Sequence, residues 1–322
     1  MKVVALAGGV GGAKMAYGLA KALLPGDLTV VVNIGDDFDH LGLRICPDLD
    51  TVCYTLAGIA NPDTGWGRVD ETWNAMDSLA DLGGPDWFRL GDHDLATHLE
   101  RTRLLNEGFS LSEITHRFCQ TWGVQTRVLP ASDDPVPTLV QVEEGDLPFQ
   151  EYFVQRQCQP KVKGFCFQGI ENANPAPGVF RAIDEAQVVI LCPSNPWVSI
   201  DPILNLPGVR ARLIPGSKSD HRSVVGVSPL IGGRAVKGPA AKMYTEFGIP
   251  PSSLAVAQHY GAQAKGGLLN GFVLDVVDAL QAGQIRAQEI QVLVTNTMMN
   301  STNDRVRFAK EVLDFGQRMM PC

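Results

Sequence analysis

Four glycines near the start of the chain have the spacing of an anion-binding turn. Gly8, Gly9, Gly11 and Gly12 follow a short apolar run, and Lys14 comes two residues later, near the start of the next predicted helix. Glycine amides ahead of a helix can point at a phosphate, which a side chain would hold away. The third glycine of a dinucleotide fingerprint is replaced by Lys14, and no Gly-Lys-Ser/Thr completes a Walker pattern. A phosphate site and a plain tight turn between strand and helix both fit these residues.

A cluster of acids follows the next predicted strand, 28–33. Asp36 and Asp37 lie in the loop after it, and Asp48 and Asp50 lie at the start of the following helix. Ligands of open parallel sheets bind outside the carboxyl ends of the strands, so this loop and the glycine loop should line one crevice. Carboxylates beside bound phosphates are the usual ligands of Mg²⁺. In the structural alternative the loop acids only face solvent, and Asp48 and Asp50 only cap their helix.

Two later strands end in polar segments of the same kind. Ser194 and Asn195 follow the predicted strand 187–192, where a turn and a ligand site are both possible. The predicted strand 223–228 leads into a stretch that offers a second anion-binding loop. That stretch contains Gly232, Gly233, Arg234 and Lys237.

Short buried strands alternate with amphipathic helices, which predicts an α/β fold. We expect a Rossmann-like, mostly parallel sheet with helices on both faces and an inserted, mainly helical smaller region. The predicted core covers 1–65 and 180–322, and the inserted cap or substrate region covers 66–179. Sheet strands are expected at 3–7, 28–33, 187–192, 223–228, 254–257 and 291–295.

The composition argues against several classes of protein. The 322 residues are 45% hydrophobic, enough for a full core, and the net charge of −8 disfavours a general nucleic-acid binder. No apolar run approaches the roughly 20 residues of a membrane span. A strand at the very start leaves no room for a signal peptide, so a cytoplasmic protein is expected. The seven cysteines form no C-x-x-C pair and the histidines no H-x-x-x-H, which predicts reduced thiols and no zinc site.

Six motifs occur in order along nearly the whole chain, namely Gly8-Gly-Val-Gly-Gly-Ala-Lys14, Asn33-Ile-Gly-Asp-Asp37, Pro47-Asp-Leu-Asp-Thr-Val52, Phe88-Arg-Leu-Gly-Asp92, Cys192-Pro-Ser-Asn-Pro196 and Ile231-Gly-Gly-Arg-Ala-Val-Lys-Gly-Pro239. Together they resemble the 2-phospho-L-lactate transferase family of coenzyme F420 biosynthesis. The resemblance implies transfer of a phospholactyl or phosphoenolpyruvyl group from a GDP-activated donor, lactyl- or enolpyruvoyl-2-diphospho-5'-guanosine. The acceptor is the ribityl hydroxyl of 7,8-didemethyl-8-hydroxy-5-deazariboflavin (Fo), and the products are (dehydro) coenzyme F420-0 and GMP. It also implies Mg²⁺ and a homodimer.

Carried over residue by residue, the resemblance places Asp50 and Arg89 against Fo. Taken alone, Arg89 could equally form an ion pair with Asp92. We expect Asp36 and Asp37 to hold Mg²⁺, with Asp50 and Asp37 as catalytic residues. Because an aspartate pKa of about 4 makes a weak base at neutral pH, Asp50 is better suited to orient the acceptor hydroxyl than to deprotonate it. The nucleotide is expected at Gly8, Gly9, Gly11, Gly12, Lys14, Ser194, Asn195, Gly232, Gly233, Arg234 and Lys237.

Two other functions remain open at this point. A nucleotide-sugar-binding regulator of the same fold would lack transferase activity, but Asp50 and Arg89 in their motifs favour the enzyme. A dinucleotide oxidoreductase would need an acid at the end of the second strand, where Asn33 lies. No residue distinguishes phospholactate, phosphoenolpyruvate and phosphoglycerate, although bacterial relatives often use the phosphoenolpyruvate-derived donor.

Overall fold

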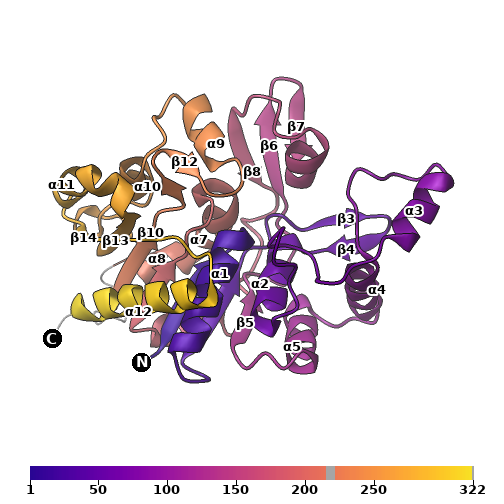
Figure 1. Cartoon of the computed structure of the whole chain (residues 1–322), viewed down its shortest axis with the longest axis horizontal. Helices are drawn as coiled ribbons and strands as arrows, with labels where there is room; N and C mark the ends of the chain where they lie inside the picture. Colours follow the sequence, from indigo (N-terminus) through magenta and orange to yellow (C-terminus); the bar gives the residue numbers. More distant parts are fainter. Residues whose placement is uncertain (215–221, 321–322) are drawn as a thin grey trace.

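A seven-stranded parallel sheet forms the centre of the molecule. The computed structural model describes residues 1–214 and 222–320. The strand order is β14-β13-β10-β9-β1-β2-β5, and each neighbouring pair is parallel (Figure 1). The predicted mostly parallel α/β fold is therefore confirmed. The strands are β1 (Val3–Ala7), β2 (Leu28–Val32), β5 (Arg127–Pro130), β9 (Val188–Leu191), β10 (Ser223–Val227), β13 (Gly271–Asp275) and β14 (Gln291–Thr295).

Helices cover the sheet on both faces, which explains why its strands read as continuous apolar runs. All five residues of β1 are buried. Helix α1 (Gly9–Ala22) packs between α2 (Pro47–Ala57) and α12 (Thr302–Arg318) (Figure 1). The approach to α12 requires Gly18, because a Cβ there would lie 2.2 Å from the carbonyl oxygen of Arg305. From β1 the sheet is extended on one side by β2 and β5, and on the other side by β9, β10, β13 and β14. Because crossovers between parallel strands are right-handed, the connecting helices of these two halves lie on opposite faces of the sheet.

The segment between β2 and β9 carries a second, smaller group of elements. Its helices are α3 (Asn74–Asp81), α4 (Asp92–Asn106) and α5 (Leu111–Thr121), and Ser110 opens α5 with a capping box. A three-stranded antiparallel sheet follows, with β6 (Thr138–Val142) between β7 (Gly145–Pro148) and β8 (Gly164–Phe167). One strand of the central sheet, β5, also lies inside the predicted inserted region 66–179.

Two local predictions for the second half of the sheet were wrong. Residues 254–257, expected as a strand, belong to helix α10 (Ser253–Tyr260), whose cap Ser252 accepts a hydrogen bond from the amide of Ala255 at 3.1 Å. A four-residue apolar run does not distinguish a buried strand from a buried helix. The position in the sheet is filled instead by β13, which the sequence prediction missed.

The remaining elements complete the two ends of the fold. Between β2 and α2 the chain forms the hairpin β3 (Phe38–His40) and β4 (Leu43–Ile45), where a loop without strands was expected.

Among the described residues, no helix is both long and apolar enough to cross a membrane. The other elements are η1 (Glu151–Gln155), α6 (Val179–Glu185), η2 (Pro196–Ile200), α7 (Asp201–Leu204), α8 (Val209–Leu213), β11 (Leu230–Ile231), β12 (Arg234–Ala235), α9 (Ala240–Glu246), η3 (Gln263–Lys265), η4 (Val276–Gln281) and α11 (Ala282–Arg286).

The cysteines within the described residues are free thiols. Cys166 is exposed, Cys158 is half-buried, and Cys322 lies outside the described residues. The buried thiols are Cys46, Cys53, Cys119 and Cys192.

Candidate active site

A cavity of about 650 Å³ opens along the carboxyl ends of the central strands. The segments after β1, β2, β9, β10 and β14 all contribute to its wall, as does the start of α2. This is the edge at which open parallel sheets bind ligands. The sequence-predicted residues that line it are Gly8, Gly9, Gly11, Lys14, Asp36, Asp50, Arg89, Ser194, Asn195 and Lys237. Those that do not line it are Gly12, Asp37, Gly232, Gly233 and Arg234.

The glycine segment is the first turn of α1 rather than a loop ahead of it. The helix begins at Gly9, although the predicted helix started after the glycines, near Lys14. A Cβ on Gly11 would lie 2.2 Å from the carbonyl oxygen of Pro193, and one on Gly12 would lie 2.7 Å from Ser194 Oγ. Glycine is therefore required here because the segment after β9 packs directly on this turn.

Two amides of the glycine segment are already bonded within the protein. Gly9 N donates to Asp48 Oδ1 at 2.7 Å, and Gly8 N donates to Ser194 Oγ at 3.1 Å. Asp48 makes no capping bond in its own helix, where Cys46 is the N-cap residue. The alternative that Asp48 only caps α2 is therefore wrong, because its carboxylate satisfies the positive N-terminus of α1 instead.

Asp36 and Asp48 form a buried pair of like charges at the cavity wall. The side-chain amide of Asn33 donates to Asp36 Oδ1 at 3.0 Å and to Asp48 Oδ2 at 2.9 Å. Burial raises the pKa of Asp48 to about 6. Burial, reinforced by the charge of Asp48, raises the pKa of Asp36 well above its usual range. Two carboxylates in this setting favour a proton or a cation between them.

Asp37 lies behind this pair, away from the cavity. Its side chain is buried, and its Oδ1 atom has no hydrogen-bond partner in the described part of the chain. Burial raises the pKa of Asp37 to about 7, opposed by a hydrogen bond with Cys46 and by the charges of Arg44 and Arg101. The structure thus separates the two acids that the sequence grouped together.

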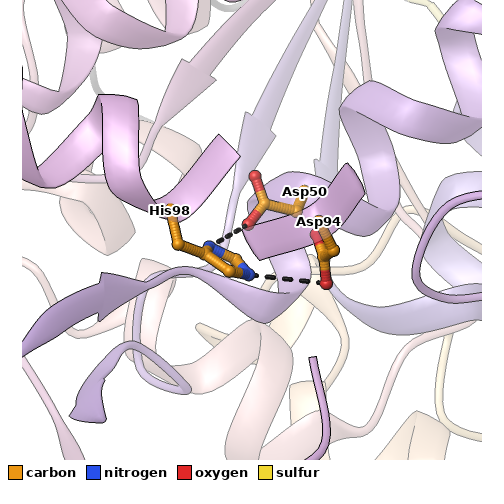
Figure 2. Close-up of side chains that lie close together, drawn as sticks. All are labelled: Asp50, Asp94 and His98. Carbon is orange, nitrogen blue, oxygen red and sulfur yellow. Dashed lines mark ion pairs between the residues drawn. The ribbon is translucent and has the colours of Figure 1, made fainter. Parts of the chain in front are cut away.

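Asp50 lies at the cavity wall beside two residues of α4 (Figure 2). His98 Nδ1 is 3.7 Å from Asp50 Oδ2, and His98 Nε2 is 3.4 Å from Asp94 Oδ2. Asp94 and His98 are one helical turn apart, so both point from α4 toward α2. Arg101, on the next turn, forms a buried ion pair with Asp50 Oδ1. Burial raises the pKa of Asp50, and the Arg101 charge opposes that rise.

Asp50, Asp94 and His98 are residue types that bind metal ions, but the position of Arg101 argues against a metal site here. Their ligand atoms lie within 4.8 Å of one another. Arg101 occupies Asp50 Oδ1 and also donates from Nη1 to His98 Nδ1 at 3.0 Å. A guanidinium bonded to two of the potential ligands repels a further cation. We therefore interpret the cluster as a hydrogen-bonded network that fixes Asp50.

Arg89 is half-exposed at the mouth of the cavity. It pairs with Asp77 at 2.6 Å and lies over the ring of Trp73, 5.2 Å from the ring centroid. The alternative pairing with Asp92 does not form. Asp92 instead accepts from the amides of Asn74 and Ala75 at the start of α3.

Two lysines, Lys14 and Lys237, also line the cavity. Burial lowers the pKa of Lys14, with further lowering by Arg305 and Lys237. Lys237 Nζ donates to the carbonyl oxygen of Thr64. Neither lysine forms an ion pair with a carboxylate in residues 1–214 and 222–320. Their charges are therefore available to an anionic ligand.

Sequence reasoning missed three groups of lining residues. Asp94 and His98 were detectable in principle from their four-residue spacing in Asp92-His-Asp-Leu-Ala-Thr-His98. Asp275 holds Thr297 through the amide at 2.8 Å and the hydroxyl at 3.0 Å, which places the segment after β14 at the cavity. The third group is aromatic and comprises Trp66, Trp87, Phe88, Phe149 and Phe153.

Comparison with known proteins agrees with this architecture. The family model of 2-phospho-L-lactate transferase CofD matches residues 3–312. Phosphoenolpyruvate transferase of Streptomyces coelicolor is 42% identical over 99% of both chains. The Mycolicibacterium smegmatis phosphoenolpyruvate transferase is 42% identical over 92% of this chain and 94% of its own. A Bacillus halodurans crystal structure shares the fold with a TM-score of 0.62 at 15% identity, covering 97% of this chain and 99% of that one. The chain therefore belongs to the CofD family of 2-phospho-L-lactate transferases.

Proposed function

We propose that the protein transfers a phospho-three-carbon-acid group from a GDP-activated donor to the ribityl hydroxyl of Fo, releasing GMP. The observation that carries this proposal is the composition of one continuous cavity. Its wall is made up of two parts, aromatic rings with carboxylates and the cations Lys14 and Lys237. An acceptor with a flat ring and hydroxyls suits the first part, and a diphosphate suits the second. The similarity to two phosphoenolpyruvate transferases supports the phosphoenolpyruvyl donor.

The acceptor is proposed to lie near α2 and α4. Trp87 and Phe88 offer flat apolar surface for a deazaflavin ring, and Arg89 stands at the same mouth. Asp50 lines the wall with an Oδ2 atom that has no hydrogen-bond partner among the residues described. That oxygen can accept the hydrogen of a ribityl hydroxyl and hold it toward the donor phosphorus.

The donor is proposed to extend along the sheet edge in the other direction. Lys14 and Lys237 would neutralise its diphosphate, and Ser194 and Asn195 would flank it. Ser228 follows β10 and the segment 297–300 follows β14, so the nucleoside has wall contacts farther along the same edge. This order leaves the activated three-carbon acid next to Asp50, where the two substrates must meet.

Mg²⁺ is proposed as the cofactor, and the residues at the cavity fit it. Asp36 and Asp48 both line the cavity, share one amide donor and have raised pKa values because they are buried. These two carboxylates would hold the ion, in place of the expected pair Asp36 and Asp37. When bound, Mg²⁺ supplies charge neutralisation for the diphosphate.

The reaction requires no covalent bond between the protein and a substrate, so the protein acts by positioning the substrates and neutralising charge. The acceptor oxygen attacks the phosphorus that carries the three-carbon acid, and the bond from that phosphorus to the GMP oxygen breaks. Lys14 and Lys237 would stabilise the charge that develops on GMP. Asp50 orients the attacking hydroxyl and accepts its hydrogen bond, and the proton is lost to solvent as the new bond forms.

An assay of the transfer reaction tests the proposed function. Purified protein is incubated with Fo, Mg²⁺ and either lactyl- or enolpyruvoyl-2-diphospho-5'-guanosine, and products are resolved by chromatography with mass detection. We expect GMP and the F420-0 product in equal amounts, with faster turnover of the enolpyruvoyl donor. Absence of product with both donors, together with binding of nucleotide sugars, would support the regulator instead. Light scattering of the same preparation tests the proposed homodimer.

A further inference from the structure

We propose that Arg101 is a positioning residue for the transfer, which acts by fixing the carboxylate of Asp50 toward the acceptor. The proposal rests on the proposed function of the same cavity. Asp50 lines the cavity, whereas Arg101 does not. Arg101 therefore acts on the reaction through Asp50 and not by touching substrate.

The contacts of Arg101 define one geometry for its guanidinium. The side chain is 2% exposed. Nη2 pairs with Asp50 Oδ1, and Nη1 donates to His98 Nδ1 at 3.0 Å and to the carbonyl oxygen of Arg44 at 3.3 Å. The guanidinium also lies 5.9 Å from the ring centroid of Phe118. Groups from four separate segments thus fix this cation, and it in turn fixes one oxygen of Asp50.

His98 contributes a defined tautomer to this arrangement. Arginine can only donate hydrogen bonds, so His98 Nδ1 accepts and the proton of the neutral ring is on Nε2. Nε2 faces Asp94 Oδ2 at 3.4 Å, and Tyr54 donates to Asp94 Oδ1 at 2.7 Å. Figure 2 shows the ring between the two carboxylates. His98 therefore supports Arg101 from α4, and Asp94 lies beside the other nitrogen of its ring.

The two oxygens of Asp50 consequently have different roles. Oδ1 is occupied by Arg101, while Oδ2 is buried and has no hydrogen-bond partner among the residues described. An unsatisfied buried acceptor is costly, and a buried ion pair by itself is weak evidence for added stability. Both features are expected where a carboxylate is held ready for a ligand that donates to it. The acceptor hydroxyl is such a donor.

A double-mutant cycle tests whether Arg101 acts through Asp50. Arg101→Lys keeps the charge but cannot form the planar two-nitrogen contact. We expect it to lower kcat and to weaken Fo binding, each by about tenfold, while KM for the donor stays unchanged. In the Asp50→Asn background the same substitution should have little further effect on Fo binding, because its target carboxylate is gone. Equal losses in both backgrounds would show a structural role and overturn the proposal.

Arg103→Lys is the matched control. Arg103 lies on the same helix but is exposed, and it pairs with Glu100 and Glu107 rather than with a cavity residue. It should change neither kcat nor Fo binding. Thermal unfolding of each variant separates lost function from lost structure.

A pair of variants at His98 tests the same proposal if Arg101→Lys does not fold. His98→Gln retains an oxygen that can accept from Arg101, so it should keep more Fo binding than His98→Leu, which cannot. Equal binding by these two variants would contradict the role of the network. If the wild-type protein shows no transfer, the proposed function fails; if it transfers and the cycle is additive, only the role of Arg101 fails.

Discussion

The amide of Gly9 donates to the carboxylate of Asp48 at 2.7 Å, so the N-terminus of α1 is bonded to an acid of the protein itself. In many nucleotide-binding folds that position belongs to a phosphate. Here a phosphate placed at the same point would meet the charge of Asp48 and of its neighbour Asp36. A bound diphosphate therefore needs cations beside it, and the cavity offers Lys14, Lys237 and a carboxylate pair suited to Mg²⁺.

The first prediction concerns the carboxylate pair. Asp36→Asn and Asp48→Asn should each raise the Mg²⁺ concentration needed for half-maximal transfer by about tenfold or more, because one ionic ligand is lost. The measurement is transfer rate against free Mg²⁺. Asp39→Asn is the control, since Asp39 is exposed and pairs with Arg44. An unchanged Mg²⁺ dependence in both buried variants would remove these residues from the metal site.

The second prediction concerns the two cavity lysines. Lys14→Ala and Lys237→Ala should each weaken GDP binding by roughly ten- to a hundredfold, the range expected for a charge-assisted contact. Calorimetric titration with GDP measures the effect. Lys21→Ala, in the last turn of the same helix as Lys14, should leave the affinity unaltered. Wild-type affinity in both cavity variants would place the diphosphate elsewhere.

The third prediction concerns pH and Asp37. Its pKa is about 7 in the folded protein, against about 3.9 in an unfolded chain. Because the folded value is the higher one, this group stabilises the fold fully below pH of about 4, and that contribution is lost as pH rises through 7. Asp37→Asn should abolish this loss, so its stability relative to wild type should increase from pH 5 to pH 8. Urea unfolding in EDTA at both values measures it, and a constant difference would contradict the assignment.

The fourth prediction concerns the contact between the glycine segment and the segment that follows β9. Gly11→Ala should destabilise the protein by about 1–3 kcal/mol, because its Cβ would lie 2.2 Å from the Pro193 carbonyl oxygen and force the backbone apart. Gly283→Ala is the control, since no atom lies within 4 Å of its added Cβ. Chemical unfolding compares the two. A Gly11→Ala variant as stable as wild type would mean that the two segments separate at little cost.

Most strands of the central sheet could be predicted because a short stretch of sequence is enough to indicate each of them. Strands β1, β2, β9 and β10 are apolar runs bounded by glycine, proline or polar residues, and a buried parallel strand needs nothing more. The half-buried strand β14 has an apolar run of the same kind. The strand β13 and the helix α10 were confused because both are short apolar runs whose type is settled by packing. The close approach of the Pro193 carbonyl oxygen to Gly11 joins two segments that lie far apart in sequence.

The location of the candidate site could be predicted from the sequence, but the hydrogen bonds and ion pairs within it could not. The rule that ligands bind at the carboxyl ends of parallel strands located the cavity and most of its lining. The bond from Gly9 to Asp48 joins residues 39 apart in sequence, and the pair of Arg101 with Asp50 joins residues 51 apart. No spacing pattern carries such contacts, because they arise only when α2 packs against α1 and α4. For the same reason Asp36 and Asp37, adjacent in sequence, have different environments.

The most direct measurement of the central claim is the binding of Fo, followed by its fluorescence with and without Mg²⁺ and GDP. The account predicts saturable binding by the wild-type protein, weakened at least tenfold in Asp50→Asn and in Arg89→Ala. Asp77→Asn serves as the control for Arg89, since it removes only the surface partner of that arginine. Binding that is equally strong in the two site variants, or no binding by the wild-type protein under any condition, would contradict an Fo site between α2 and α4.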